Sequence, residues 1–129
     1  MGFLAVIAAA VATFAFGAVY YIILSKPWME AADIEVGEDG KPVNDGPLPY
    51  IVAFVSITLV AGMMRHTFAT SEMASGHGFV AGLGVGLFFI SPWIFINTGY
   101  SNRPWRLALI DSGYATFGCA VMGLVLTLF

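Results

Sequence analysis

Four long apolar stretches dominate the sequence and limit it to a narrow class of folds. They cover residues 3–24, 48–64, 78–96 and 107–129. A helix that crosses the hydrocarbon core of a bilayer needs about 20 apolar residues, and each stretch reaches or approaches this length. Because lipid offers the backbone no hydrogen-bond partners, such segments fold as helices. The sequence therefore predicts an all-α protein, an integral membrane four-helix transmembrane bundle with one acidic extramembrane loop.

Prolines and turn residues between the apolar stretches set the expected helix ends. The helices are expected at about 3–24, 49–66, 77–96 and 104–128. Pro49 and Pro104 suit first helical turns, because proline has a fixed φ and needs no hydrogen-bond acceptor there. A polar loop at about 25–48 joins the first two helices, and residues 1–129 are expected to form a single transmembrane domain.

Composition supports this class and excludes others. Only 10% of the residues are charged, whereas an average soluble domain has about 25%. With five Lys plus Arg and a net charge of −3, the chain has no basic field, so nucleic acid is not an expected partner. The first apolar stretch lacks a basic n-region and is expected to stay as a spanning helix. Its expected surroundings are membrane lipids.

The loop between the first two helices carries most of the acidic residues. Residues 25–47 hold six acidic and two basic side chains, a balance of −4. Asp39-Gly40 favours a tight turn, which leaves a short hairpin possible, but the spacing of acids does not match a calcium-binding loop. A solvated loop at 31–45 is therefore the preferred interpretation.

The distribution of Lys and Arg predicts the orientation in the membrane. Lys26, Lys41, Arg103 and Arg106 lie in loops on one side, and Arg65 lies on the other. Since cytoplasmic loops carry the excess of basic residues, both termini are predicted to lie outside the cytoplasm.

Small residues at four-residue spacing predict where helices pack closely. Gly78, Gly82 and Gly86 form a glycine stripe on the third helix. Gly17 on the first helix, and Cys119 with Gly123 on the last, continue the pattern. A neighbouring helix must fill the glycine groove. A partner within the bundle is the preferred interpretation, with contact between two copies as the alternative.

The most informative stretch is Asn97 to Tyr114, because it places an acid inside the membrane. Asp111 lies seven residues after Pro104, or about 10 Å along the helix. An unpaired carboxylate is costly at that depth, so it must face protein. Arg103 is the preferred partner. The other expected members of this buried polar cluster are Asn97, Tyr100, Ser112 and Tyr114.

Two interpretations of Asp111 remain open: a hydrogen-bonded structural corner, or a proton acceptor or cation site in a cavity. The expected interface anchors are Trp28, Trp93, Trp105 and Arg106. His66 and His77 are weak candidates for metal or haem ligation, since their separation fits no tight motif. No nucleophile–base motif is present, so the chain is expected not to be an enzyme and to need no cofactor.

Three segments resemble a known family. The segments are GAVYYIILSKPW at 17–28, the glycine-rich third apolar stretch, and NTGYSNRPWRLALIDSGY at 97–114. Together they are similar to the bacterial membrane family catalogued as domain of unknown function 1761 (DUF1761). The resemblance implies a four-span protein of uncharacterised activity in the bacterial cytoplasmic membrane. The acidic loop at 31–45 is the least family-typical part.

The preferred function is a non-enzymatic binding, assembly or accessory subunit. It would pack through its glycine-lined faces as a homo-oligomer or within a larger membrane complex. The alternative is a small proton-coupled transporter that uses Asp111. A lesser alternative is haem or copper binding through His66 and His77.

Overall fold

The computed structural model describes residues 2–32, 47–70 and 77–128, all of them helical or in short connections. The elements are α1 (Gly2–Ile23), α2 (Ser25–Ala32), α3 (Leu48–Thr70), α4 (Gly78–Val85), the π-helix η1 (Gly86–Ile90), α5 (Ser91–Tyr100) and α6 (Trp105–Leu128). Four segments are long and apolar enough to cross a membrane: Phe3–Ile23, Leu48–Ala69, Gly78–Tyr100 and Trp105–Leu128. The predicted all-α class with four spanning helices is confirmed.

Two of the spanning helices run further than the sequence signals indicate. α3 continues to Thr70 rather than ending near residue 66, and the third span continues to Tyr100 rather than residue 96. No proline or glycine interrupts the chain between residues 66 and 70, so nothing stops the helix there. The possible hairpin and the acidic part of the first loop fall within residues 33–46, outside the described residues.

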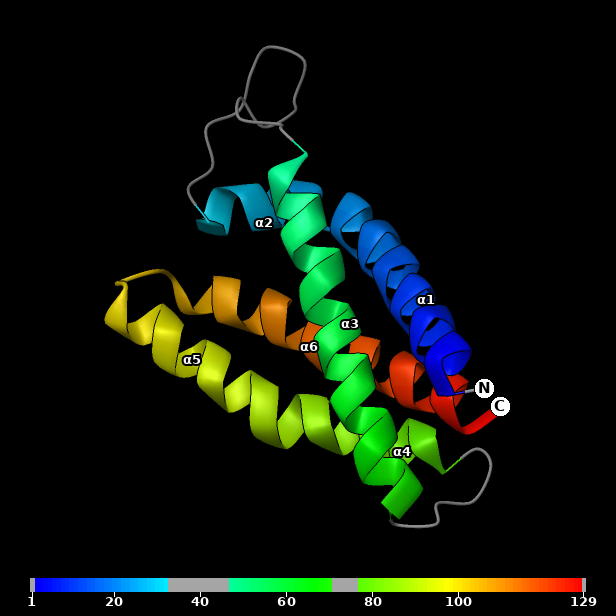
Figure 1. The fold of residues 1–129 in the computed structure, drawn as a ribbon. Coiled ribbons are helices and arrows are strands. Elements are labelled where there is room, and N and C mark those ends of the chain that lie inside the picture. The colour runs from blue at the N-terminus through cyan, green and yellow to red at the C-terminus, as the bar shows by residue number, and fades with distance from the viewer. Residues whose placement is uncertain (1, 33–46, 71–76, 129) are drawn as a thin grey trace.

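The first eight residues of the predicted polar loop are not a loop but form the short helix α2. Pro27 is the third residue of α2, in the first turn where its missing N–H costs little. Met29, Ala31 and Ala32 are buried, whereas Glu30 is exposed. Ala31 and Ala32 pack with Leu107 at the start of α6. α2 therefore lies across one end of the bundle, against α6 (Figure 1).

α6 is the central helix, in contact with each of the other helical elements. In its most apolar part 44% of the residues are buried, against 11% for α3 at the periphery. α1 packs against both α3 and α6. In Figure 1 the start of α1 and the end of α6 lie at the same end of the bundle, as an even number of spans requires.

The predicted glycine stripe packs against α6 within the same chain. A Cβ atom added to Gly82 would overlap the carbonyl oxygen of Cys119. Gly78 meets the carbonyl of Gly123 in the same way, and Gly86 meets that of Ala115. The two backbones approach so closely that only glycine fits on the α4 side. Partnership inside the bundle, the preferred interpretation, is what the structure shows for this stripe.

Pro92 alters the third span just before its own position. Proline cannot donate the helical hydrogen bond, and the preceding turn widens into η1. The Ser91 hydroxyl donates to the carbonyl of Gly86 over 2.7 Å and lies 3.2 Å from the Thr116 hydroxyl. The span therefore remains continuous and stays attached to α6.

The corner between α5 and α6 is a tight helix C-cap. Asn102 has a positive φ of 56°, a conformation that asparagine tolerates better than most residues. The Arg103 N–H bonds the carbonyl of Thr98, and the Asn102 N–H bonds that of Gly99, which is the Schellman pattern. This turn reverses the chain and directs Arg103 toward α2.

Candidate functional site

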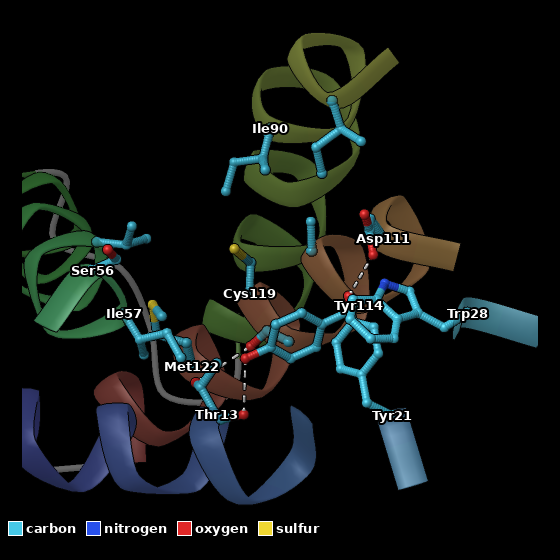
Figure 2. Close-up of a pocket in the computed structure, with 14 residues that line it drawn as sticks. Thr13, Tyr21, Trp28, Ser56, Ile57, Ile90, Asp111, Tyr114, Cys119 and Met122 are labelled. Atoms are coloured by element: carbon cyan, nitrogen blue, oxygen red, sulfur yellow. Dashed lines mark hydrogen bonds between the residues drawn. The ribbon is translucent and has the colours of Figure 1, made fainter. Parts of the chain in front are cut away.

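A groove of about 410 Å³ lies beside α6, next to the face that packs on the glycine stripe, and shares Ala115 and Cys119 with that face. α1, α2, α3, η1, α5 and α6 all contribute to it (Figure 2). Most lining atoms are apolar, and Asp111 is the one acid among the lining residues. The lining residues are Thr13, Tyr21, Trp28, Ser56, Ile57, Val60, Ile90, Ile94, Asp111, Tyr114, Ala115, Gly118, Cys119 and Met122.

Asp111 is held at one end of this groove by neutral donors. The Tyr21 hydroxyl donates to Asp111 Oδ1 over 2.8 Å. The indole nitrogen of Trp28 is directed at the same carboxylate and contacts it (Figure 2). Tyr21 lies in the last turn of α1. Trp28 lies on α2, just beyond the break between the two helices at Leu24. That break turns the indole back over α1 toward α6.

Two aromatic side chains, Tyr21 and Trp28, contact the carboxylate, and a third, Tyr114, packs against Tyr21. The ring of Tyr21 lies edge-on to those of Trp28 and Tyr114, with centroids 5.6 Å and 5.4 Å apart. Both distances fall in the range of favourable edge-to-face contacts. The rings pack against one another and fix the positions of the two donors at the end of the groove.

Small residues make room for the ring of Tyr114. A Cβ on Gly17 would lie 2.8 Å from that ring, and a Cβ on Gly118 would lie 3.1 Å from it. The Tyr114 hydroxyl donates to the carbonyl of Thr13 over 3.3 Å. Gly17, predicted to admit a neighbouring backbone, therefore admits a side chain that lines the groove.

The arginine expected to pair with Asp111 is used elsewhere. Arg103 Nη1 donates to the carbonyl of Ala32 and so caps the end of α2. Arg106 pairs with Glu30 over 3.7 Å, and both side chains are largely exposed. Within the described ranges 2–32, 47–70 and 77–128, no basic side chain forms an ion pair with Asp111. The predicted Arg103–Asp111 pairing is corrected accordingly.

Three other members of the predicted polar cluster do not line the groove. Asn97 and Tyr100 are exposed at the α5–α6 corner. Ser112 is buried where α6 packs against Ser91, and its carbonyl accepts from the Ser91 hydroxyl over 3.3 Å. Only Asp111 and Tyr114 from that predicted cluster line the groove.

The predicted anchors and metal candidates are placed as follows. Trp93 and Trp105 are exposed, at 64% and 60%. Trp28 is partly buried in the groove, so it contributes to the site as well as marking the helix end. His66 and His77 are both exposed. The described residues contain no group of three or more His, Cys, Asp or Glu placed to hold a metal ion.

Tyr21 is the functional candidate that sequence reasoning missed. Tyr20 and Tyr21 lie near the end of the first apolar stretch, where aromatic rings are common at the membrane interface. A signal was available: Tyr21 precedes the Pro27 break by six residues, and Asp111 follows Pro104 by seven. The two residues therefore lie at similar depths below the same end of the bundle.

The fold and the groove define a class: a small four-span helical membrane protein with a carboxylate inside its spanning region. Comparison with known families places it further. The sequence matches the family described as "Protein of unknown function (DUF1761)" over residues 4–127, and the chain belongs to this family. No curated protein and no solved structure gives a significant match.

Proposed function

We propose that this protein is a non-enzymatic membrane protein that binds a lipophilic small molecule in the groove beside α6. One observation carries the proposal: an apolar groove of about 410 Å³ ends on the carboxylate of Asp111. Small-molecule sites are typically concave, about 300–1,000 Å³, mostly apolar and supplied with a few polar groups. The apolar walls would hold the body of the ligand, and Asp111 would orient its polar end.

The position of the groove favours a ligand that partitions into the bilayer. α3 contributes Ser56, Ile57 and Val60, and the other flank is formed by Ile90 and Ile94. These residues all lie within spanning segments. A ligand dissolved in the hydrocarbon would reach the groove between α3 and α5 without leaving the membrane.

A proton-coupled transporter is the second candidate, favoured by the position of Asp111 in a span. However, the groove follows α6 only from Asp111 to Met122, which is about 16 Å at the helical rise. The hydrocarbon core is about 30 Å thick, so this groove covers about half of it. Binding is therefore better supported than passage. Unchanged proton-coupled flux of a bound ligand in Asp111→Asn proteoliposomes would remove the carboxylate from any transport mechanism.

Assembly with a second copy or another membrane protein stays a proposal, but it would have to use a surface other than the glycine stripe. α6 fills the stripe at Gly78, Gly82 and Gly86, so that stripe is not available to a partner. Gly62 on α3 and Gly84 on α4 have open space around them. An oligomer would use those faces. Loss of the oligomer in a Gly84→Leu variant, measured by light scattering in detergent, would support this.

The proposed location is the bacterial cytoplasmic membrane, with both termini outside the cytoplasm. The basis is the excess of Lys26, Lys41, Arg103 and Arg106 in the loops of one side. A reporter enzyme fused to the C-terminus, active only outside the cytoplasm, tests this orientation. An active reporter is expected, and an inactive one with an intact fusion would reverse it.

The groove itself is tested by filling it. Ser56 lines the groove, whereas its neighbour Val55 is exposed and does not. A panel of lipophilic compounds is screened by thermal unfolding of the protein in lipid nanodiscs. A ligand present at 100 times its Kd stabilises the folded state by about 2.7 kcal/mol. Wild type and Val55→Phe are expected to respond equally, and Ser56→Phe to respond much less. Equal responses from all three would contradict binding in the groove.

A further inference from the structure

We propose that the ligand of this groove is a lipophilic organic cation, a quaternary or protonated amine with apolar substituents. This inference rests on the proposed function and names the chemical class that the site recognises. Three features of the site carry it: among the described residues the carboxylate has no cationic partner, two aromatic side chains contact it, and the remaining walls are mostly apolar.

The carboxylate is hydrogen-bonded, but its charge is not balanced. Tyr21 and Trp28, its two donor groups, are both neutral. In the part of the chain that the structure describes, the basic residues nearest the α6 start engage Ala32 and Glu30 instead. Asp111 is half-buried, and an opposite charge stabilises a carboxylate there more than in bulk water, because the protein screens the interaction less. The groove therefore offers a position where a cation would gain a partner.

The aromatic rings add a second attraction for positive charge. Tyr21 and Trp28 contact the carboxylate, Tyr114 packs against Tyr21, and all three line the groove. The face of an aromatic ring attracts cations within about 6 Å of its centroid, most strongly for tryptophan. Aromatic groups around a cation are a common means of recognising quaternary ammonium ligands.

The walls exclude a bare metal ion and favour an alkylated cation. Calcium takes roughly six to eight oxygen ligands. The polar side chains of the lining, besides Asp111, include the hydroxyls of Thr13 and Ser56, but most lining atoms are carbon. An organic cation brings its own apolar surface, which these walls would cover.

We assign the cation to a free molecule rather than to a lipid headgroup. Asp111 lies about 10 Å along α6 from its start, below the level of the headgroups. A lipid amine would carry its phosphate down with it, toward the carboxylate, and the two like charges repel. A free cation has no such neighbour.

Trp28 provides a reporter inside the site. Replacing Trp93 and Trp105 with phenylalanine changes two exposed residues and leaves Trp28 as the one tryptophan. This variant is placed in phosphatidylglycerol nanodiscs. Its fluorescence is titrated with benzyltrimethylammonium and, separately, with neopentylbenzene, which has the same shape with carbon in place of nitrogen.

The comparison uses Asp111→Asn, which keeps an acceptor for Tyr21 and so preserves local packing. For each protein the affinity ratio of the two ligands is taken. The ratio for the reporter protein with Asp111 is divided by the ratio for the same protein carrying Asp111→Asn. This division cancels the different partitioning of the two ligands into lipid. A quotient of at least tenfold in favour of the cation is expected.

Other outcomes would overturn the inference in distinguishable ways. Binding of both ligands with a quotient near one would leave a lipophile-binding groove but reject the cation. Binding of neither ligand, combined with no effect of Ser56→Phe on any compound of the panel, would reject the groove as a ligand site altogether. Competition by phosphatidylethanolamine in the nanodisc would assign the site to a lipid amine instead of a free molecule.

A second variant protects the test against misfolding of the first. Tyr21→Phe keeps the ring and is expected to hold the cation preference within about threefold. Tyr21→Leu removes the ring and is expected to lower the cation preference more than Tyr21→Phe does. An equal loss in both variants would mean that the hydroxyl, not the ring, supports binding, and would remove the aromatic part of the proposal.

Discussion

The two sides of α6 use the same kinds of small residue to opposite effect. On one side, Ala115, Cys119 and Gly123 present carbonyls against glycines of the third span, and the helices close completely. On the adjoining side, which shares Ala115 and Cys119 with the first, Gly118 borders an open groove that ends at Asp111. Small residues therefore permit close approach but do not cause it. The outcome depends on whether the facing helix also lacks side chains.

The open side faces elements that carry large rings. Tyr21 meets the rings of both Trp28 and Tyr114, and these rings line one end of the groove. The contrast separates a part of the molecule that provides stability from a part that is free to bind. Substitutions on the closed side should change folding, and substitutions on the open side should change ligand binding.

The largest effect is expected for Gly82→Ala on the closed side. The added methyl would overlap the backbone carbonyl of Cys119, which cannot move aside alone, so the two helices must separate. Forcing extra volume into a packed contact typically costs about 1–3 kcal/mol. The free energy of unfolding, measured by titration with a denaturing detergent, is expected to fall by that amount.

Gly84→Ala is the matched control, because it adds the same methyl only two residues away, on another face of α4. No atom lies within 4 Å of a Cβ at Gly84. Its unfolding free energy is expected to stay the same or rise slightly, since alanine favours helix more than glycine does. Equal losses in both variants would show that the glycine stripe is not the closed contact.

A smaller effect is expected for Tyr21→Phe on the open side. The change removes the 2.8 Å hydrogen bond to Asp111 and keeps the ring. Hydrogen bonds between membrane helices contribute about 0.6 kcal/mol on average, with about 1.7 as an upper value. Unfolding in mixed detergent should show a loss in that range. Tyr100→Phe, at an 87% exposed residue, is the control and should be neutral. No difference between them would remove the Tyr21–Asp111 contact from the account.

The smallest stability effects are expected at the end of α6, where two arginines hold α2. Arg103→Ala removes the cap on the Ala32 carbonyl and should raise hydrogen exchange across residues 25–32. Arg106→Ala removes only the exposed pair with Glu30. Exposed ion pairs contribute about 0–1 kcal/mol, so its exchange should stay near that of the wild type. Faster exchange in Arg106→Ala than in Arg103→Ala would reverse the assignment of roles.

The sequence predicted the spanning helices and the glycine stripe because both depend on local patterns. Apolar length defines a span, and four-residue spacing defines a helix face. The partner of the stripe was left open between the same chain and a second copy, since spacing gives no information on which helix is adjacent. The end of α3 was missed because its last residues, including His66, are polar yet remain helical.

The site was only partly predictable, because it depends on two places where the chain changes direction between helices. The sequence placed Asp111 in a span and required it to face protein, but it named Arg103 as the partner from its position on the same helix. α2 and the break at Leu24 bring Trp28 back over the bundle, and the corner at Asn102 directs Arg103 to Ala32. Both are contacts between segments far apart in the chain, and a helical projection of a single segment cannot predict them.

The central claim is that the Asp111 carboxyl faces a groove that opens to the lipid. A lipophilic carbodiimide, which enters the membrane and modifies protonated carboxyls, tests it directly at mildly acidic pH with mass spectrometry of the peptides. Modification of Asp111 is expected in the wild type and in Val55→Phe, and strong protection in Ser56→Phe. Exposed Glu30, modified by a water-soluble carbodiimide, is the control. An unmodified Asp111, or equal modification in all three proteins, would contradict the account.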